Sequence, residues 1–243
     1  MIEASKHPLL ERAFSALNRS MLRRAFHSVR LQGADHLRRL DRTRPVIVFG
    51  NHSSWWDGLI EFYLSREVFR FDAYLIMDEE QMSRYSFFRW IGAFSVNRHS
   101  PREAVRSLQY AVELFDRPNR LLWIYPQGIM RPNDSRPLDF EGGVAWIAQH
   151  LRNPQLVPLA HRYEFIKDQR PDAFLRFGPM VSVPSLADPE AAAHELEQVL
   201  TDHLDCLRKT IASERFNEFE TILQGKRSTN SKYDSVRGLE SKQ

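Results

Sequence analysis

The stretch PVIVFGNHSSWWD, residues Pro45–Asp57, decides the fold of this chain and carries its candidate site. The apolar run Val46–Phe49 predicts a short buried strand. Gly50 ends that run, and apolar side chains then recur with helical spacing from Leu59 to Leu64. A buried strand that turns directly into a helix is the repeating unit of layered α/β proteins, so the stretch predicts that class of fold.

The junction between this strand and this helix holds His52 and Asp57, five positions apart. A tight turn can fold the Asp57 carboxylate back onto one ring nitrogen of His52, which leaves the other nitrogen free to deprotonate a substrate hydroxyl. The same pair also has a purely structural interpretation, in which Asp57 caps the helix and His52 forms a hydrogen bond within the loop. Residues elsewhere in the chain have to decide between these two interpretations.

The composition predicts a protein with a substantial core. At 243 residues, with 42% hydrophobic residues and 16 Phe, the chain is long enough for one large domain or two small ones. Cys206 is its single cysteine, which excludes an intramolecular disulfide and fits a reducing compartment. Neither the ~20 apolar residues of a spanning helix nor the apolar core of a secretion signal is present. The chain is therefore expected to be soluble or bound to a membrane surface.

Positive charge is concentrated in residues 1–44. They contain ten Lys or Arg against four Asp or Glu, although the formal net charge of the whole chain is only +3. Within residues 7–30, apolar side chains recur every three or four positions and the arginines fall largely on the other face. Such a basic amphipathic helix either lies in a membrane interface or packs on the protein's own core. Both interpretations hold if the core covers only part of the apolar face.

Strands and helices are predicted to alternate from residue 45 onward. The expected strands lie near residues 46–49, 73–77, 92–96, 121–125, 156–161 and 174–183. The expected helices lie near residues 58–66, 85–91, 101–115, 142–150 and 189–213. We therefore predict a single α/β domain, a layered sheet with flanking helices, over residues 45–213. Residues 1–44 are expected to form an N-terminal amphipathic helical segment, and residues 214–243 a polar C-terminal tail.

Polar side chains follow the predicted strands at their carboxyl ends, where open α/β sheets place their functional groups. In chain order these are Asn51-His52 with Asp57, Asn97-Arg98, Gln127-Gly128 with Arg131, and His161-Arg162. A guanidinium group binds phosphate oxygens in a bidentate manner, so the arginines suit a phosphate-bearing ligand. Each arginine alone is more simply explained as a solvated surface charge. Agreement among four strand ends favours one shared cleft.

These residues, in this order, resemble the glycerolipid (lysophospholipid) acyltransferase family. The resemblance covers about residues 45–185, and its implied fold is glycerol-3-phosphate acyltransferase-like. His52-Ser-Ser-Trp-Trp-Asp57, preceded by Asn51, is similar to the family's His-x4-Asp block. The later blocks that carry the resemblance are Gly92–Arg98, Tyr125–Arg131 (usually Phe-Pro-Glu-Gly-Thr-Arg), Phe140–Gly143 and Leu156–Leu159.

The resemblance implies transfer of a fatty acyl group from an acyl-CoA or acyl carrier protein thioester to a hydroxyl of a lysophospholipid or other lipid acceptor. His52 would be the general base, and Asp57 would orient its imidazole. The thioester is already activated, so neither a metal, a redox cofactor nor a Ser or Cys nucleophile is required. Peripheral binding at the cytoplasmic face of a membrane is implied. The residues expected to bind substrate are Asn51, Arg98, Gln127, Gly128 and Arg131, with groups near Gly128 stabilising the oxyanion.

Two departures from the family pattern bear on the acceptor. Gln127 stands where the family has Glu, which removes a charge but keeps an acceptor. Arg131 follows Gly128 by three residues rather than two, so this loop must be rebuilt. A sugar or terpenoid hydroxyl is therefore an alternative acceptor.

Other classes of function are less well supported. A non-catalytic lipid- or membrane-binding protein on the same fold is the strongest alternative, but binding alone requires neither a base nor its orienting carboxylate. The chain has no G-x-S-x-G motif of an α/β-hydrolase. It also has no basic stripe with stacking aromatics for nucleic acid, and no His-x-x-x-His pair with a third metal ligand. Ser53 and Ser54 are interpreted as turn residues. Trp55 and Trp56 fit an acyl-chain tunnel, a membrane contact or simple core packing.

Overall fold

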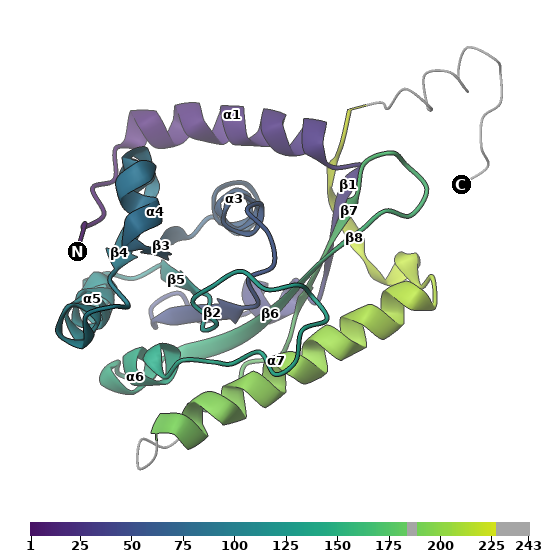
Figure 1. Ribbon diagram of the computed structural model, residues 1–243. Helices are drawn as coiled ribbons and strands as arrows, with labels where there is room; N and C mark the ends of the chain where they lie inside the picture. The colour runs from purple at the N-terminus through teal and green to yellow at the C-terminus, as the bar shows by residue number, and fades with distance from the viewer. Residues whose placement is uncertain (184–188, 227–243) are drawn as a thin grey trace, which may run out of the picture.

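The computed structural model describes residues 1–183 and 189–226, and within them eight strands form one mixed sheet (Figure 1). The strands are β1 (Ser28–Gln32), β2 (Val46–Gly50), β3 (Asp72–Asp78), β4 (Ala93–Val96), β5 (Arg120–Ile124), β6 (Gln155–Glu164), β7 (Asp172–Phe177) and β8 (Glu220–Gln224). Their order in the sheet is β4-β3-β5-β2-β6-β7-β1-β8. Neighbours from β4 to β6 are parallel, as are β7 and β1, whereas β6–β7 and β1–β8 are antiparallel. The predicted α/β layered fold is confirmed.

Helices cover both faces of the sheet, as Figure 1 shows. The α-helices are α1 (Pro8–Ala25), α2 (Asp35–Arg38), α3 (Asp57–Tyr63), α4 (Glu79–Arg84), α5 (Pro101–Glu113), α6 (Gly143–His150) and α7 (Pro189–Ala212). A π-helical segment, Leu64–Phe69, continues α3, and short 3-10 turns cover Ser86–Ile91, Leu114–Asp116 and Phe216–Glu218. One hydrophobic core joins the sheet to α1 and α3, and a second joins it to α5, α6 and α7.

The central strand β2 explains why one short stretch decides the fold. Val46 and Val48 point into the core beneath α1 and α3, whereas Ile47 and Phe49 point into the core beneath α5, α6 and α7. All four side chains are at most 1% exposed. A strand that is buried on both faces reads as a continuous apolar run rather than as an alternating one. The sequence signal of β2 is therefore clear without any neighbouring strand.

The two ends of the sheet differ from the prediction. Residues 28–32, expected in the N-terminal helical segment, form β1, because the chain becomes extended at Phe26. Residues 220–224, expected in the C-terminal tail, form β8, which pairs with β1. These strands are short and gain their hydrogen bonds from partners that are distant in sequence, so tertiary pairing overrides the local pattern. The part of the expected tail from residue 227 onward lies outside the described residues.

Smaller differences occur at two element boundaries. The helix expected over residues 85–91 is a 3-10 turn, and α4 precedes it. Asp78 caps α4, because its carboxylate accepts hydrogen bonds from the main-chain N–H groups of Glu80 and Gln81. The strand expected over residues 174–183 ends at Phe177, and Val181 forms only an isolated bridge with Leu156.

Helix α1 packs on the protein's own core along part of its apolar face. Leu22 is fully buried, and the Phe14 ring lies 5.2 Å from the Phe62 ring of α3, centroid to centroid. Leu9 and Leu17, in contrast, are 67% and 56% exposed. The core therefore covers one part of the apolar face and leaves another part open. Among the described residues, the search for a helix long and apolar enough to cross a membrane found none.

Candidate active site

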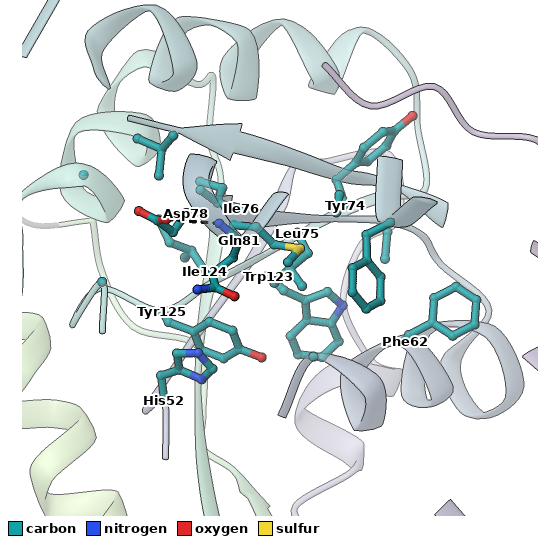
Figure 2. A pocket seen from close by; sticks show the side chains of 18 of the residues that line it. His52, Phe62, Tyr74, Leu75, Ile76, Asp78, Gln81, Trp123, Ile124 and Tyr125 are labelled. Atoms are coloured by element: carbon teal, nitrogen blue, oxygen red, sulfur yellow. Dashed lines mark hydrogen bonds between the residues drawn. The ribbon is translucent and has the colours of Figure 1, made fainter. Parts of the chain in front are cut away.

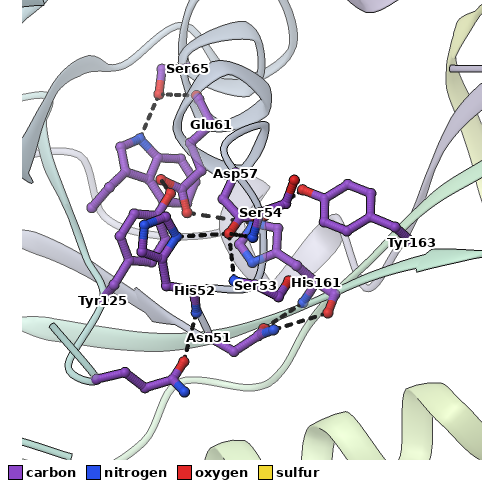
Figure 3. A network of polar contacts seen from close by, with 12 residues as sticks. Asn51, His52, Ser53, Ser54, Asp57, Glu61, Ser65, Tyr125, His161 and Tyr163 are labelled. Atoms are coloured by element: carbon purple, nitrogen blue, oxygen red, sulfur yellow. Dashed lines mark hydrogen bonds and ion pairs between the residues drawn. The ribbon is translucent and has the colours of Figure 1, made fainter. Parts of the chain in front are cut away.

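His52 and Asp57 meet in the turn between β2 and α3 (Figure 3). The His52 Nδ1 atom lies 2.8 Å from Asp57 Oδ2. The same carboxylate oxygen accepts the main-chain N–H groups of Ser53 and Ser54 at 2.8 and 2.9 Å, and Oδ1 accepts the Tyr163 hydroxyl. Asp57 therefore stabilises the turn and binds the imidazole at once, so the two interpretations of this pair are not exclusive.

Asp57 remains ionised although its side chain is fully buried. Burial is the largest influence on its pKa and raises it, but the hydrogen bond from His52, the nearby His161 and the Tyr163 hydroxyl together bring the pKa below its usual value. An ionised Asp57 fixes the proton of His52 on Nδ1. The Nε2 atom is then the ring nitrogen that can accept a proton from a ligand.

The main chain of His52 is held by the loop after β5. Gln127 is 3% exposed, and its Oε1 accepts the His52 N–H at 2.7 Å. The His52 carbonyl in turn accepts the Arg131 N–H at 2.8 Å. An amide oxygen serves this hydrogen bond as well as a carboxylate does, so Gln127 keeps the structural part of the role that the resembled family gives to Glu.

Gly128 gives this loop its shape. Its φ of +65° lies in the left-handed region, and an added Cβ would lie 2.6 Å from Arg98 Cζ. Arg98 Nη1 donates to the Gly128 carbonyl at 2.9 Å. The Gly128 N–H donates to the Tyr125 carbonyl at 3.0 Å and is therefore engaged. The Gly128 N–H is therefore not free to be the oxyanion donor expected near this residue, and the Arg98 guanidinium lies against the same loop.

The predicted cations already have acidic partners. Arg98 Nε donates to Glu141 at 3.0 Å, and Arg131 Nη2 lies 2.8 Å from Asp139. Arg162, which was predicted at a strand end, lies within the longer strand β6 and pairs with Asp134 at 2.8 Å. A phosphate that binds Arg98 or Arg131 would compete with these ion pairs.

Asn51 connects strand ends. It is 2% exposed, accepts the His161 N–H at 2.7 Å and donates to the His161 carbonyl at 3.1 Å. These bonds join the end of β2 to β6 and give Asn51 a structural role behind the His52–Asp57 pair.

A cavity of about 670 Å³ opens beside His52 (Figure 2). β3 pairs with β5 only as far as Leu75 and Trp123, and the rest of β3 pairs with β4 alone. The cavity is lined from both sides of this divergence, mainly by apolar side chains that include Leu59, Phe62, Trp123, Ile124, Leu108 and Val144. Arg98, Gly128 and Glu141 also line it. An apolar cavity beside a histidine and a few polar groups is typical of a small-molecule site.

The sequence analysis assigned no role to several residues around the catalytic pair. Glu61 is the next carboxylate on α3 and lies one turn after Asp57, a spacing that could have singled it out. Tyr125 stands in the third block, and its ring lies 4.3 Å from the His52 ring with an angle of 5° between them. Tyr163 lies on β6 and has no motif that would have identified it, whereas His161, on the same strand, was predicted at a strand end but without a role.

Comparisons with known proteins bear on the fold and the family of the chain. The fold is similar to the crystal structure of the 1-acyl-sn-glycerophosphate (LPA) acyltransferase PlsC from Thermotoga maritima. The TM-score is 0.57 and the sequence identity 19%, with 83% of this chain and 79% of that chain covered. No curated protein matches the chain. The model of the family described as Acyltransferase matches residues 28–162, more than half of the 243 residues. This chain belongs to the acyltransferase family.

Proposed function

We propose that the protein transfers a fatty acyl group from an acyl-CoA or acyl carrier protein thioester to a hydroxyl of a lysophospholipid or another lipid acceptor. The observation that carries the proposal is the His52–Asp57 pair, with Nδ1 bound to Asp57 and Nε2 left beside an apolar cavity. A non-catalytic binding protein could use the turn that Asp57 stabilises, but it would not need an imidazole bound to that carboxylate beside the cavity. Family membership supports acyl transfer in general, and the acceptor and donor classes are part of the proposal.

The proposed reaction is a direct displacement at the thioester carbonyl. His52 Nε2 takes the proton of the acceptor hydroxyl while its oxygen bonds to the carbonyl carbon. The tetrahedral intermediate then collapses, the carbon–sulfur bond breaks, and the thiolate receives the proton from His52, so that an ester and a thiol leave. Asp57 stabilises the imidazolium that exists between these two proton transfers. No metal or redox cofactor takes part in this scheme.

The apolar cavity would hold the acyl chain. Each buried methylene contributes about 0.8 kcal/mol, so a long chain would gain much of its binding free energy there. Arg98, beside Gly128 at the cavity wall, would bind a phosphate or stabilise the oxyanion, and Arg131 would act from the same loop.

Filling this cavity is expected to change the preferred chain length. Leu75 lines the cavity on β3, and in Leu75→Trp the larger ring would occupy space needed by a long chain. We expect kcat/KM for long-chain thioesters to fall by about 10-fold more than that for short-chain thioesters. Steady-state rates with a series of acyl donors measure this, and Leu75→Ala serves as the control that enlarges the site. An equal loss for every chain length would place the acyl chain elsewhere.

The exposed face of α1 is proposed to bind a membrane on its cytoplasmic side, the side on which the acyl donor would be found. Leu9 and Leu17 are exposed beside exposed arginines of α1, including Arg12 and Arg19, and Phe14 of the same helix contacts the exposed Phe87. Apolar side chains would enter the acyl boundary while the arginines meet anionic headgroups.

We expect Leu17→Asp to weaken binding to anionic vesicles by about 10-fold or more, because it replaces an apolar contact with a charge that the lipid headgroups repel. Co-sedimentation with vesicles of mixed zwitterionic and anionic lipid measures the effect. Met180→Asp is the matched control, because Met180 is also about half exposed but lies after β7. Equal loss in both variants would contradict a membrane surface on α1.

The central test of the proposed function is thiol release from an acyl thioester by the purified protein, with and without a panel of lysophospholipid and other hydroxyl acceptors. Release that depends on the acceptor, with formation of the ester, supports the proposal and identifies the acceptor class. Release that ignores the acceptor would indicate a thioesterase. Vesicle or lipid binding without any release would favour the non-catalytic alternative.

A further inference from the structure

A buried polar cluster lies behind His52 and has no part in the reaction described above (Figure 3). Glu61, on α3, is 1% exposed, and the Tyr125 hydroxyl donates to its Oε2 atom at 2.6 Å. His161 is fully buried, and its Nε2 lies 3.5 Å from Glu61 Oε1. The Ser65 hydroxyl donates to the Glu61 carbonyl and accepts the Trp123 indole N–H, both at 2.8 Å. Tyr125 and His161 thus contact the Glu61 carboxyl group, and Ser65, itself bound by Trp123, holds the Glu61 main chain.

The surroundings of Glu61 favour its uncharged carboxylic acid form over the carboxylate. Burial is the main cause that raises its pKa well above the usual value, and the Asp57 carboxylate adds to this, against the opposing effect of the Tyr125 hydrogen bond. Among residues 1–183 and 189–226, the basic group that lies within ion-pair distance of Glu61 is His161. Burial lowers the pKa of His161, so its ring is neutral. Burial and the neighbouring Glu61 also raise the pKa of Tyr125 well above its usual value, which keeps its hydroxyl protonated as a donor.

Tyr125 connects Glu61 to His52. The phenol ring lies flat on the imidazole, with ring centroids 4.3 Å apart and an angle of 5° between the planes. Asp57 fixes the Nδ1 edge of the imidazole, but one hydrogen bond leaves the ring free to tilt about it. Tyr125 covers the face of the ring, and its own hydroxyl is held by Glu61. A phenylalanine, the usual residue at this place in the resembled blocks, would cover the same face without this anchor.

We propose that Glu61 is a positioning residue of the acyl-transfer site, because it holds the Tyr125 ring flat against His52 and so keeps Nε2 directed at the cavity. This rests on the proposed function of His52 as the base. An uncharged Glu61 also suits this positioning role. A second carboxylate beside Asp57 would favour the protonated imidazole, which cannot accept the proton of an acceptor hydroxyl.

Three single variants and one double variant distinguish a positioning role of Glu61 from simple packing. In Glu61→Gln, an uncharged amide of the same shape still accepts the Tyr125 hydroxyl, so we expect kcat within about 3-fold of the wild type. In Glu61→Leu and Tyr125→Phe the anchor is lost, and kcat should fall by about 10-fold or more while KM for the acyl donor stays unchanged. The double variant Glu61→Leu/Tyr125→Phe should be no worse than the poorer single variant, because both remove the same contact. Additive losses, or a matching rise in KM, would overturn the proposal.

Two measurements do not depend on turnover. Infrared spectra at neutral pH should show the carboxylic acid C=O stretch of Glu61, which Glu61→Gln lacks and Asp57→Asn retains. Absence of that band from the wild type would mean an ionised Glu61 and would overturn the uncharged assignment. Proton NMR should show the His52 ring signals displaced by the stacked Tyr125 ring. Glu61→Leu should shift these signals and Glu61→Gln should leave them in place, whereas unmoved signals in Glu61→Leu would overturn positioning.

These measurements also separate the inference from the proposed function. If the wild type shows no acyl transfer but both spectroscopic results appear, the proposed function fails and the Glu61–Tyr125–His52 arrangement stands. If acyl transfer is present but Glu61→Leu leaves kcat and the His52 signals unchanged, the proposed function stands and the inference fails. Thermal unfolding of each variant shows that it is folded before its rate is compared.

Discussion

His52→Ala is expected to lower kcat for acyl transfer by about 10³-fold, with little change in KM for the acyl donor. The variant removes an imidazole that lines the cavity and has its Nδ1 atom bound to the Asp57 carboxylate. The acceptor hydroxyl would then have to lose its proton to water. The measurement is acceptor-dependent thiol release by the wild type and the variant at equal concentrations of folded protein.

Ser53→Ala is the matched control for this variant. Ser53 is adjacent to His52, and its hydroxyl has no hydrogen-bond partner among the residues that the structure describes. If the hydroxyl were a nucleophile, its loss would abolish activity and remove any acyl-enzyme intermediate. We expect Ser53→Ala to keep activity within about 3-fold of the wild type, in line with direct attack on an activated thioester. Equal rates for His52→Ala and the wild type would refute the assignment of His52 as the base.

Asp57→Asn is expected to lower kcat by about 10²-fold to 10³-fold, no more than His52→Ala, because Asp57 acts through the imidazole. The side chain keeps its size, but an amide carries no charge to stabilise the imidazolium. Its NH₂ group would also face one of the donors that now point at the carboxylate: His52 Nδ1, the N–H groups of Ser53 and Ser54, and the Tyr163 hydroxyl. The same thiol-release assay measures kcat, and thermal unfolding measures the loss of stability.

Tyr163→Phe is the control for the structural part of this effect. It removes one hydrogen bond to Asp57 and leaves the His52 contact in place. We expect a loss of stability of about 1 kcal/mol, with a much smaller change in kcat than in Asp57→Asn. Comparable rates in the two variants would mean that Asp57 acts on the turn rather than on the imidazole.

The lowered pKa of Asp57 predicts how the stability of the wild type and that of Asp57→Asn differ at acidic pH. An acid whose pKa is lower in the folded chain than in the unfolded chain stabilises the fold above its ordinary pKa, here 3.8, and loses that contribution as the pH falls through the lowered value. Denaturant unfolding of the wild type should therefore lose stability in this window below pH 3.8. Asp57→Asn lacks the titrating group, so the stability difference between the two proteins should shrink there.

The parts of the fold that sequence patterns predicted are those with a clear local pattern, a continuous apolar run or helical spacing of apolar residues. β2 and the start of α3 follow from the apolar run Val46–Phe49 and the helical spacing after Asp57. β1 and β8 were missed for a physical reason. β1 and β8 are five residues long each. They are held in the sheet by hydrogen bonds to each other, although they lie almost two hundred residues apart in the sequence. The strand propensity of a short segment does not indicate a partner so distant in the sequence.

The candidate site also contains some contacts that the sequence could predict and others that it could not. The His52–Asp57 contact spans five positions and could be predicted, because one turn closes it. Ion pairs such as Arg98 with Glu141 cross from one loop to another, and no spacing indicates them. The anchoring of Tyr125 by Glu61 is a third case. Glu61 lies in an apolar helix where a lone carboxylate needs an explanation, but its partner arrives from a different strand.

The place of β1 in the sheet also sets an order of events during synthesis. Both of its neighbours, β7 and β8, are made long after it, since Gln32 precedes Asp172 and Glu220 in the chain. A nascent chain that has released β1, β2 and β3 from the ribosome therefore carries an open strand edge with no partner of its own. Contacts of such long sequence separation form slowly, and the unfinished edge is exposed to pairing with other chains meanwhile. β8, the last of the described strands to emerge, thus covers the open edge of β1 and becomes the edge of the finished sheet.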